Sequence, residues 1–466
     1  MGLFGTSGIR EPCPSKIDAR LAMAVGRLMA GGAPALVVGY DGRRTGPMLK
    51  AALAAGAAGS GTPVLDAGFC ATPTLAYYAR ALGADGAMIT ASHNPPEYNG
   101  IKLFERGLEM PREREARIEE GLAAVLGGKT PGAWPDYTKA GEVRDVQEEA
   151  RKKHLELLLS RVDTGLIRKR RPKVVLDCAN LAGGALMPRA LTTAGAEVIV
   201  INGRTGEPYG RELEPKESTL GALMKEVVRQ GADMGIAHDG DADRAIIVDE
   251  KGGVPGLDVQ LAMAVQSVLE TDGDAHKAAR GKVGKAPARP PTVVSTVESS
   301  LSLLELCETH GAELAITPVG SLKVAQRMRQ AGAVFGGEPC GEYLFKDGTG
   351  SPDGLMAGLF FVEMFCRHGA LSARAAAIPR YPIGREKIPC PPERKAGAME
   401  RIEHAWPFSR PSGIDGFRSD EADGWVLVRP SGTEPCIRIT IEARNEGALA
   451  LMTKKARALV KKACEG

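Results

Sequence analysis

Aromatic residues are scarce in this sequence, at 5% of 466 residues, and neither sign of charge dominates, with 60 basic and 57 acidic side chains. Proteins that bind single-stranded nucleic acids stack bases on aromatic side chains. Binding to a nucleic acid or a membrane surface also calls for a clear excess of positive charge. We therefore expect no nucleic-acid and no membrane partner.

The sequence also lacks paired cysteine motifs and long apolar runs. Its nine cysteines are odd in number and contain no Cys-x-x-Cys, which argues against a disulfide framework or a zinc ribbon. No run approaches the roughly 18 apolar residues of a membrane span, and the longest candidate, 355–366, contains Glu363. The first residues show no apolar signal-peptide core. These features predict a cytoplasmic protein.

A pattern of alternating apolar strands and helices occurs three times, over 35–90, 173–238 and 291–339. Each copy reads as a buried strand, a helix, a second strand, another helix and a third strand that begins near a Gly-Ala pair. Short apolar strands in this order favour parallel βαβ units. The repeating unit is thus a domain rather than a solenoid turn.

The remainder, from about 376, reads as two strands around a Gly-containing turn followed by a basic helix, which predicts a small antiparallel α+β domain. Residues 271–291 are polar and rich in Pro and Gly, so we expect a loop there. The overall prediction is an α/β protein of three related mixed α/β domains and a smaller C-terminal α+β domain around a central cleft. The predicted domains are 1–150, 151–256, 257–375 and 376–466.

A polar loop follows the third strand of each copy: TASHNPPEYNG, DGDADR and GEPCGE. Ligands gather beyond the carboxyl ends of strands in open α/β sheets. Three such loops at equivalent positions indicate one shared site.

The first loop carries Ser92 between a buried strand and the breaker Asn94-Pro95. An exposed serine on such a turn can be a nucleophile if it is activated, although it can also simply cap the turn. His93 stands beside it. Because neighbouring side chains on an extended chain point apart, we expect His93 to have only a supporting role.

The second loop places Asp239, Asp241 and Asp243 at alternate positions. Oxygen ligands of this kind suit Mg²⁺, while a solvated acidic turn is the alternative. A calcium EF-hand is excluded because Arg244 stands where that loop requires glycine. An arginine directly after the acids indicates a phosphate nearby.

Two further loops carry weaker signals. In the third loop, Glu338 and Glu342 can accept hydrogen bonds from sugar hydroxyls, although the loop taken alone favours a plain Gly-rich turn, in which Cys340 is an ordinary small turn residue. Near the C-terminus, backbone amides, hydroxyls and arginines can cradle a phosphate, with a hairpin turn as the alternative; the residues are Arg429, Ser431, Gly432, Thr433 and Arg438.

Taken together, GTSGIR at 5–10, TASHNP at 90–95, DGDADR at 239–244, GEPCG at 337–341 and RPSGTEP at 429–435 resemble the α-D-phosphohexomutase family. The resemblance covers essentially the whole chain. It implies four domains around a deep cleft, a phosphoserine at Ser92, and one Mg²⁺ held by Asp239, Asp241, Asp243 and the phosphoserine.

The same resemblance implies roles for other residues. Arg10 and Lys102 lie near the reacting phosphate, with Lys102 as the candidate general acid/base, and Arg244 lies beside the metal. Sugar and phosphate binding falls to Thr6, Ser7, His93, Glu338, Cys340, Glu342, Arg429, Ser431, Gly432, Thr433 and Arg438. The implied reaction interconverts hexose 6-phosphate and hexose 1-phosphate through a bisphosphate intermediate, with a hexose 1,6-bisphosphate as the priming activator.

The third loop departs from the common GExSGH pattern because Cys340 replaces Ser and Glu342 replaces His. GEPCG resembles the archaeal branch of phosphoglucosamine mutases. We therefore expect glucosamine phosphate as the substrate, with Glu342 as a possible partner of its ammonium group. Mannose or glucose phosphates are the alternative substrates.

A sugar-phosphate phosphatase and a non-catalytic sugar-phosphate binding protein are the rival functions. The sequence leaves the oligomeric state open.

Overall fold

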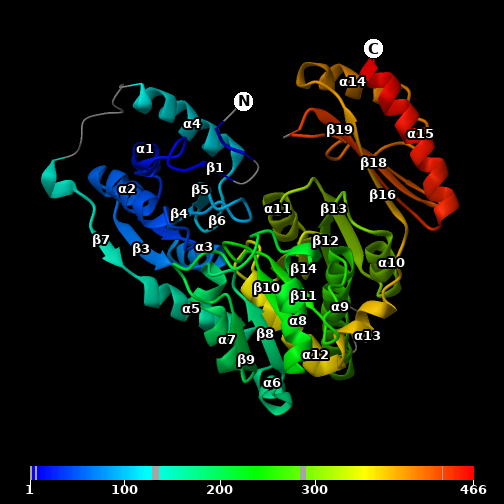
Figure 1. Ribbon diagram of the computed structural model, residues 1–466, viewed down its shortest axis with the longest axis horizontal. Coiled ribbons are helices and arrows are strands. Elements are labelled where there is room, and N and C mark those ends of the chain that lie inside the picture. The colour runs from blue at the N-terminus through cyan, green and yellow to red at the C-terminus, as the bar shows by residue number, and fades with distance from the viewer. Residues whose placement is uncertain (1–2, 6–7, 128–135, 284–289, 433, 466) are drawn as a thin grey trace. The chain divides into compact units, whose positions relative to one another are not determined.

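The computed structural model describes residues 3–5, 8–127, 136–283, 290–432 and 434–465 (Figure 1). The chain divides into two compact units. Unit 1 comprises Met1–Gly256 and Cys340–Ala375, and unit 2 comprises Leu257–Pro339 and Ala376–Gly466.

The first sheet of unit 1 has the strand order β1-β5-β4-β2-β3-β7, with β6 paired to β5. Strands β2, β3 and β4 are parallel, whereas β5 runs antiparallel to both β4 and β1. The strands are β1 (Ile9–Pro12), β2 (Leu36–Tyr40), β3 (Val64–Phe69), β4 (Asp85–Ile89), β5 (Tyr98–Glu105), β6 (Leu108–Glu109) and β7 (Val143–Asp145).

Helices cover this sheet because each presents an apolar stripe to it. Helices α1, α2 and α4 contribute to one buried cluster, and α3 contributes to another. A Cβ on Gly26 of α1 would lie 2.0 Å from the Leu53 carbonyl oxygen of α2. The close packing of the two helices therefore requires a glycine at this position. The helices are α1 (Ala19–Met29), α2 (Gly46–Gly59), α3 (Thr72–Leu82) and α4 (Arg112–Leu126).

The second sheet of unit 1 has the order β11-β10-β8-β9, in which only β11 is antiparallel to its neighbour. Its strands are β8 (Lys173–Asp177), β9 (Glu197–Ile201), β10 (Met234–His238) and β11 (Ala245–Val248). The other elements of unit 1 are η1 (Tyr137–Lys139), α5 (Gln147–Ser160), α6 (Thr164–Arg170), η2 (Ala182–Ala185), α7 (Met187–Ala194), η3 (Glu217–Thr219), α8 (Gly221–Gln230), β15 (Glu342–Phe345) and α12 (Gly354–His368). Helix α13 (Leu371–Ala377) begins in unit 1 and ends in unit 2.

Unit 2 contains the third copy of the repeat and the C-terminal sheet. In the third copy β12 lies between β13 and β14, parallel to both. Its elements are α9 (Leu257–Val283), β12 (Thr292–Thr296), α10 (Leu301–Thr309), β13 (Glu313–Thr317), α11 (Ser321–Ala331) and β14 (Phe335–Glu338).

The C-terminal sheet is antiparallel throughout, in the order β16-β19-β18-β17. Helices α14 and α15 share a buried core with it. The elements are β16 (Ile383–Pro389), α14 (Pro392–His404), β17 (Phe417–Glu421), β18 (Gly424–Pro430), β19 (Cys436–Ala443) and α15 (Glu446–Glu465).

The structure confirms the three parallel βαβ copies and the antiparallel C-terminal region. The loop predicted at 271–291 is wrong over its first part, because α9 continues to Val283. Its Ala, Lys and Arg residues are good helix formers, and the first proline comes only at Pro287.

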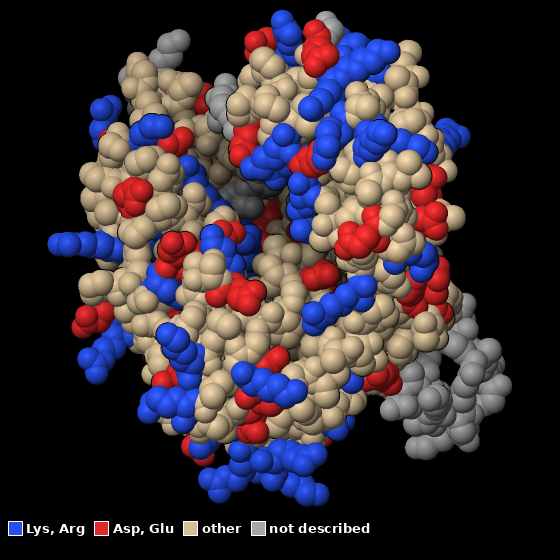
Figure 2. Space-filling model, turned by 45° about the vertical axis from the view of Figure 1, so that its right-hand side comes forward, with Lys and Arg blue, Asp and Glu red and all other residues tan. Residues whose placement is uncertain are grey.

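The predicted domain boundaries stay predictions. Within the described residues, no helix is long and apolar enough to cross a membrane. Basic and acidic side chains are interspersed over the face shown in Figure 2.

Candidate active site

Ser92 lies just beyond the carboxyl end of β4, on a backbone with φ of +49°. Its side chain is buried, and its Oγ donates a hydrogen bond of 2.6 Å to Asp239 Oδ2. The left-handed conformation is uncommon for a residue with a Cβ. Such strain gathers at functional sites.

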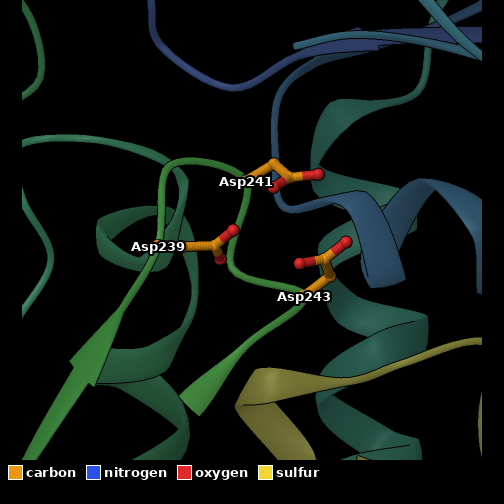
Figure 3. A group of neighbouring side chains, drawn as sticks. All are labelled: Asp239, Asp241 and Asp243. Atoms are coloured by element: carbon orange, nitrogen blue, oxygen red, sulfur yellow. The ribbon is translucent and has the colours of Figure 1, made fainter. Parts of the chain in front are cut away.

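The DGDADR segment forms the turn between β10 and β11, and its three aspartates point toward one another (Figure 3). One oxygen from each of Asp239, Asp241 and Asp243 lies within 4.8 Å of the others, and all three residues are buried. A Cβ on Gly240 would lie 2.3 Å from the Ser92 carbonyl oxygen. The serine loop (residues 91–98, up to the first residue of β5) and the aspartate loop (residues 239–244) therefore touch, as a shared site requires.

The donor set fits a divalent cation. Within the described part of the chain, Asp241 Oδ1 and Asp243 Oδ1 are buried without a hydrogen-bond partner, which is costly unless another group neutralises them. Burial and the two neighbouring carboxylates raise the pKa of Asp239 well above its ordinary value. Hard oxygen ligands of this kind suit Mg²⁺.

Asp241 is held by a residue that the sequence analysis did not identify. Thr72, at the start of α3, donates from its hydroxyl to Asp241 Oδ2 at 2.5 Å and from its amide to the Asp241 carbonyl at 2.9 Å. A Thr-Pro pair after a strand is too common to signal this role. Thr72 fixes the aspartate loop against the first sheet.

Lys102 on β5 lies between two carboxylates. Its Nζ is 2.7 Å from Glu109 Oε1 and 3.2 Å from Asp243 Oδ2. Burial alone would lower the pKa of Lys102, but Glu109, Asp243 and Asp241 more than offset it and raise the pKa above its ordinary value. The site thus favours a protonated lysine. Glu109 was not identified from the sequence.

Cations also surround Asp243 and His93. Burial would raise the pKa of Asp243, but Lys102, Arg244 and Arg10 lower it. Burial, together with Arg244 and Arg10, lowers the pKa of His93 to about 4, so its ring is neutral at pH 7. His93 Nδ1 lies 3.4 Å from Ser92 Oγ, a long contact that agrees with a supporting role.

The second half of the third loop, GEPCGE, packs against the aspartate loop. Ala245 donates to the Gly341 carbonyl at 3.0 Å, and Arg244 Nη2 lies 3.0 Å from Glu342 Oε1. Glu342 is thus already paired with an arginine, and a substrate ammonium would compete with that pair. Cys340 is half-buried and takes part in no disulfide. Arg10 on β1 donates to Asn94 Oδ1 at 3.5 Å.

Five of the other predicted binding residues lie in unit 2: Glu338, Arg429, Ser431, Gly432 and Arg438. Glu338 ends β14, and its Oε2 accepts from the Gly320 amide at 3.2 Å. Arg429 and Arg438 are directly opposite in the β18–β19 pairing, an arrangement that repels unless anions balance it. Arg429 pairs with Glu298 at 3.1 Å and Arg438 with Glu434 at 2.8 Å.

The Nε atoms of both arginines are buried without a hydrogen-bond partner among the described residues. Ser431 and Gly432 follow β18 immediately. The remaining predicted binding residues, Thr6, Ser7 and Thr433, lie outside the residues that the structure describes.

Four family models match successive parts of this sequence. They describe phosphoglucomutase/phosphomannomutase α/β/α domain I over 1–126, domain II over 152–253, domain III over 272–381 and the C-terminal domain over 386–459.

Full-length relatives agree with these matches. A probable phosphoglucosamine mutase of Methanopyrus kandleri is 39% identical over 95% of this chain and 94% of its own. Its counterpart in Thermococcus kodakarensis is 36% identical over 99% and 98%. The crystal structure of a phosphoglucomutase/phosphomannomutase family protein from Burkholderia thailandensis superimposes with a TM-score of 0.81 at 25% identity, covering 99% of this chain and 97% of that one.

Proposed function

Because this chain belongs to the phosphoglucomutase/phosphomannomutase family, we propose that it interconverts hexose 6-phosphate and hexose 1-phosphate with Ser92 as the phosphate carrier. The observation that carries the proposal is the 2.6 Å contact between Ser92 Oγ and Asp239 on a loop of three buried aspartates. In this proposal the protein acts in the cytoplasm, and its substrate is a small sugar phosphate.

The reaction proceeds by two transfers. A free sugar hydroxyl attacks the phosphorus of phospho-Ser92, the bond from phosphorus to Ser92 Oγ breaks, and a bisphosphate forms. After the sugar turns over, Ser92 Oγ attacks the other phosphate and regains a phosphoryl group. Each transfer removes a proton from the attacking hydroxyl and returns one to the leaving oxygen. Lys102, which the site holds protonated, is the proposed proton carrier: it gives its proton to the leaving oxygen and takes up the proton of the attacking hydroxyl.

Positive charge is what this transfer needs most, since catalysis of phosphoryl transfer is mainly positioning and charge stabilisation. Asp239, Asp241, Asp243 and an oxygen of phospho-Ser92 would hold Mg²⁺, which would neutralise charge on the transferring group. Arg10, Lys102 and Arg244 add fixed positive charge from the protein. A hexose 1,6-bisphosphate would load Ser92 for the first turnover.

The substrate's non-reacting phosphate is assigned to the cradle formed by Arg429, Ser431, Gly432, Thr433 and Arg438. The two opposed arginines support this assignment, because a bound anion would balance the repulsion between them. Glu338, Cys340 and Glu342, with Thr6, Ser7 and His93, complete the proposed contacts. We assign these roles within four domains at 1–150, 151–256, 257–375 and 376–466.

The preferred sugar in this proposal is glucosamine, and the names of the archaeal relatives support it. Kinetics with glucosamine, glucose and mannose phosphates test the choice. The highest kcat/KM is expected with glucosamine phosphate. An equal or higher value with glucose or mannose phosphate would overturn the sugar and leave the mutase reaction intact.

Ser92→Ala tests the reaction itself. A coupled assay for the isomerised product, with and without added bisphosphate, should detect turnover by the parent and none by the variant. Free phosphate without isomerised product would instead identify a phosphatase. Binding of sugar phosphate by a parent that shows no turnover would identify a binding protein.

A further inference from the structure

Arg43 is a buried arginine outside the proposed catalytic set, on the loop that follows β2. Its side chain is 1% exposed. A buried guanidinium is costly unless its donors are satisfied. Here the side-chain hydrogen bonds of Arg43 go to the carboxylate of Asp41 and to backbone carbonyls of the serine loop.

The four bonds from the Nη atoms of Arg43 reach backbone carbonyls of the serine loop. Nη2 donates to the carbonyls of Ser92 and Asn94, both at 2.7 Å. Nη1 donates to those of Pro95 at 2.8 Å and Tyr98 at 2.9 Å. The planar guanidinium group thus donates to four backbone carbonyls of the loop, which a lysine ammonium could not do with the same geometry.

The backbone amide of Ser92 is linked through Thr90 to the ion pair between Arg43 and Asp41. The Ser92 amide donates to Thr90 Oγ1 at 2.8 Å, and the Thr90 hydroxyl donates to Asp41 Oδ2 at 2.7 Å. Asp41 Oδ2 also accepts from Arg43 Nε at 3.2 Å. A closed ring therefore runs from the Ser92 amide through Thr90, Asp41 and Arg43 to the Ser92 carbonyl.

We propose that Arg43, Asp41 and Thr90 are positioning residues that hold Ser92 in its left-handed conformation and aim its Oγ at the aspartate loop. The inference rests on the proposed role of Ser92 as phosphate carrier. The φ of +49° at Ser92 needs support from outside the residue. The ring supplies that support at both backbone groups of Ser92.

Three variants and one matched control test the ring. Thr90→Val removes the hydroxyl relay without changing the shape of the side chain, and Thr90→Ser restores the hydroxyl. Arg43→Lys keeps the charge and removes the fork. Arg114→Lys is the control, since Arg114 pairs with Asp85 at 2.5 Å and Glu105 at 2.7 Å and Asp85 begins β4, the strand after which Ser92 lies.

We expect Thr90→Val and Arg43→Lys to lower kcat by about 100-fold, the loss that a misplacement of about 1 Å can cause, with KM nearly unchanged. Thr90→Ser should recover most of the activity. Hydrogen exchange of the amides in 91–98 should accelerate in the two impaired variants and not in Arg114→Lys.

Two outcomes would overturn the proposal. One is that folded Thr90→Val and Arg43→Lys keep the kcat of Arg114→Lys. The other is that exchange in 91–98 stays at the parent rate in both. If the parent itself shows no mutase turnover, the proposed function fails, whereas the exchange measurement still reports on the ring.

Discussion

Three buried carboxylates on one loop, Asp239, Asp241 and Asp243, cost free energy when no cation lies among them. Mg²⁺ should therefore raise the stability of the folded protein, by about 2.7 kcal/mol at a concentration 100 times its Kd. Thermal unfolding with and without Mg²⁺ measures this gain. The double variant Asp241→Asn/Asp243→Asn should lose it.

Glu115→Gln serves as the control for that measurement, because Glu115 is a buried carboxyl on α4 and is not part of the aspartate loop. It should keep the full gain from Mg²⁺. An undiminished Mg²⁺ effect in the double aspartate variant would show that the cation binds elsewhere.

Glu115 also makes a pH-dependent contribution of its own. Burial raises its pKa from 4.5 to about 7, although Arg112 acts in the opposite direction. The folded state therefore binds more protons than the unfolded state between these values, so this group makes stability fall as pH rises from 4.5 to 7.

Glu115→Gln should remove this pH-dependent loss of stability, which amounts to at most about 3 kcal/mol at pH 7.5. Denaturant unfolding of parent and variant at pH 4.5 and pH 7.5 gives the comparison. If the difference between the two proteins were the same at both pH values, Glu115 would titrate normally.

At the scale of elements, one buried histidine joins three helices of unit 1. His154 on α5 has its Nδ1 2.8 Å from Thr74 Oγ1 on α3 and its Nε2 3.0 Å from Asp353 Oδ2. Asp353 also caps α12, accepting from the amides of Leu355 and Met356. The three side chains satisfy one another's hydrogen-bonding groups.

His154→Phe should lower the free energy of unfolding by about 2–4 kcal/mol, because it leaves two buried polar groups unpaired. Exposed His404 on α14 provides the control, and His404→Phe should change stability by less than about 0.5 kcal/mol. Equal losses in the two variants would show that the buried network adds nothing.

The order of the helices and strands was predictable from the sequence, whereas the side-chain contacts that hold the loops against one another were not. Apolar periodicity locates the βαβ copies, and polar residues after their strands locate the loops. Ser92 and Asp239 are 147 residues apart; the equivalent positions of their loops predicted a shared site, and the resemblance predicted that both residues serve one metal. Thr72 and Glu109 carry no signal because threonines at helix starts and glutamates in short strands are ordinary.

At the scale of the whole molecule, the proposed chemistry divides between the two units. Unit 1 holds Ser92, the aspartates, Lys102, Arg10 and Arg244, and unit 2 holds Glu338 and the arginine pair of the phosphate cradle. Phosphoryl transfer and recognition of the substrate's far phosphate are thus assigned to separate parts of the chain. A variant of the cradle should chiefly affect substrate binding, and a variant of the serine loop the transfer.

Single-turnover transfer of labelled phosphate tests the central claim most directly. Protein labelled on Ser92, verified by peptide mapping, is mixed with unlabelled hexose monophosphate, and the label is followed by rapid quench. The label should pass from Ser92 to a sugar bisphosphate at least as fast as kcat. Label that stays on Ser92 while isomerised product accumulates would contradict the account.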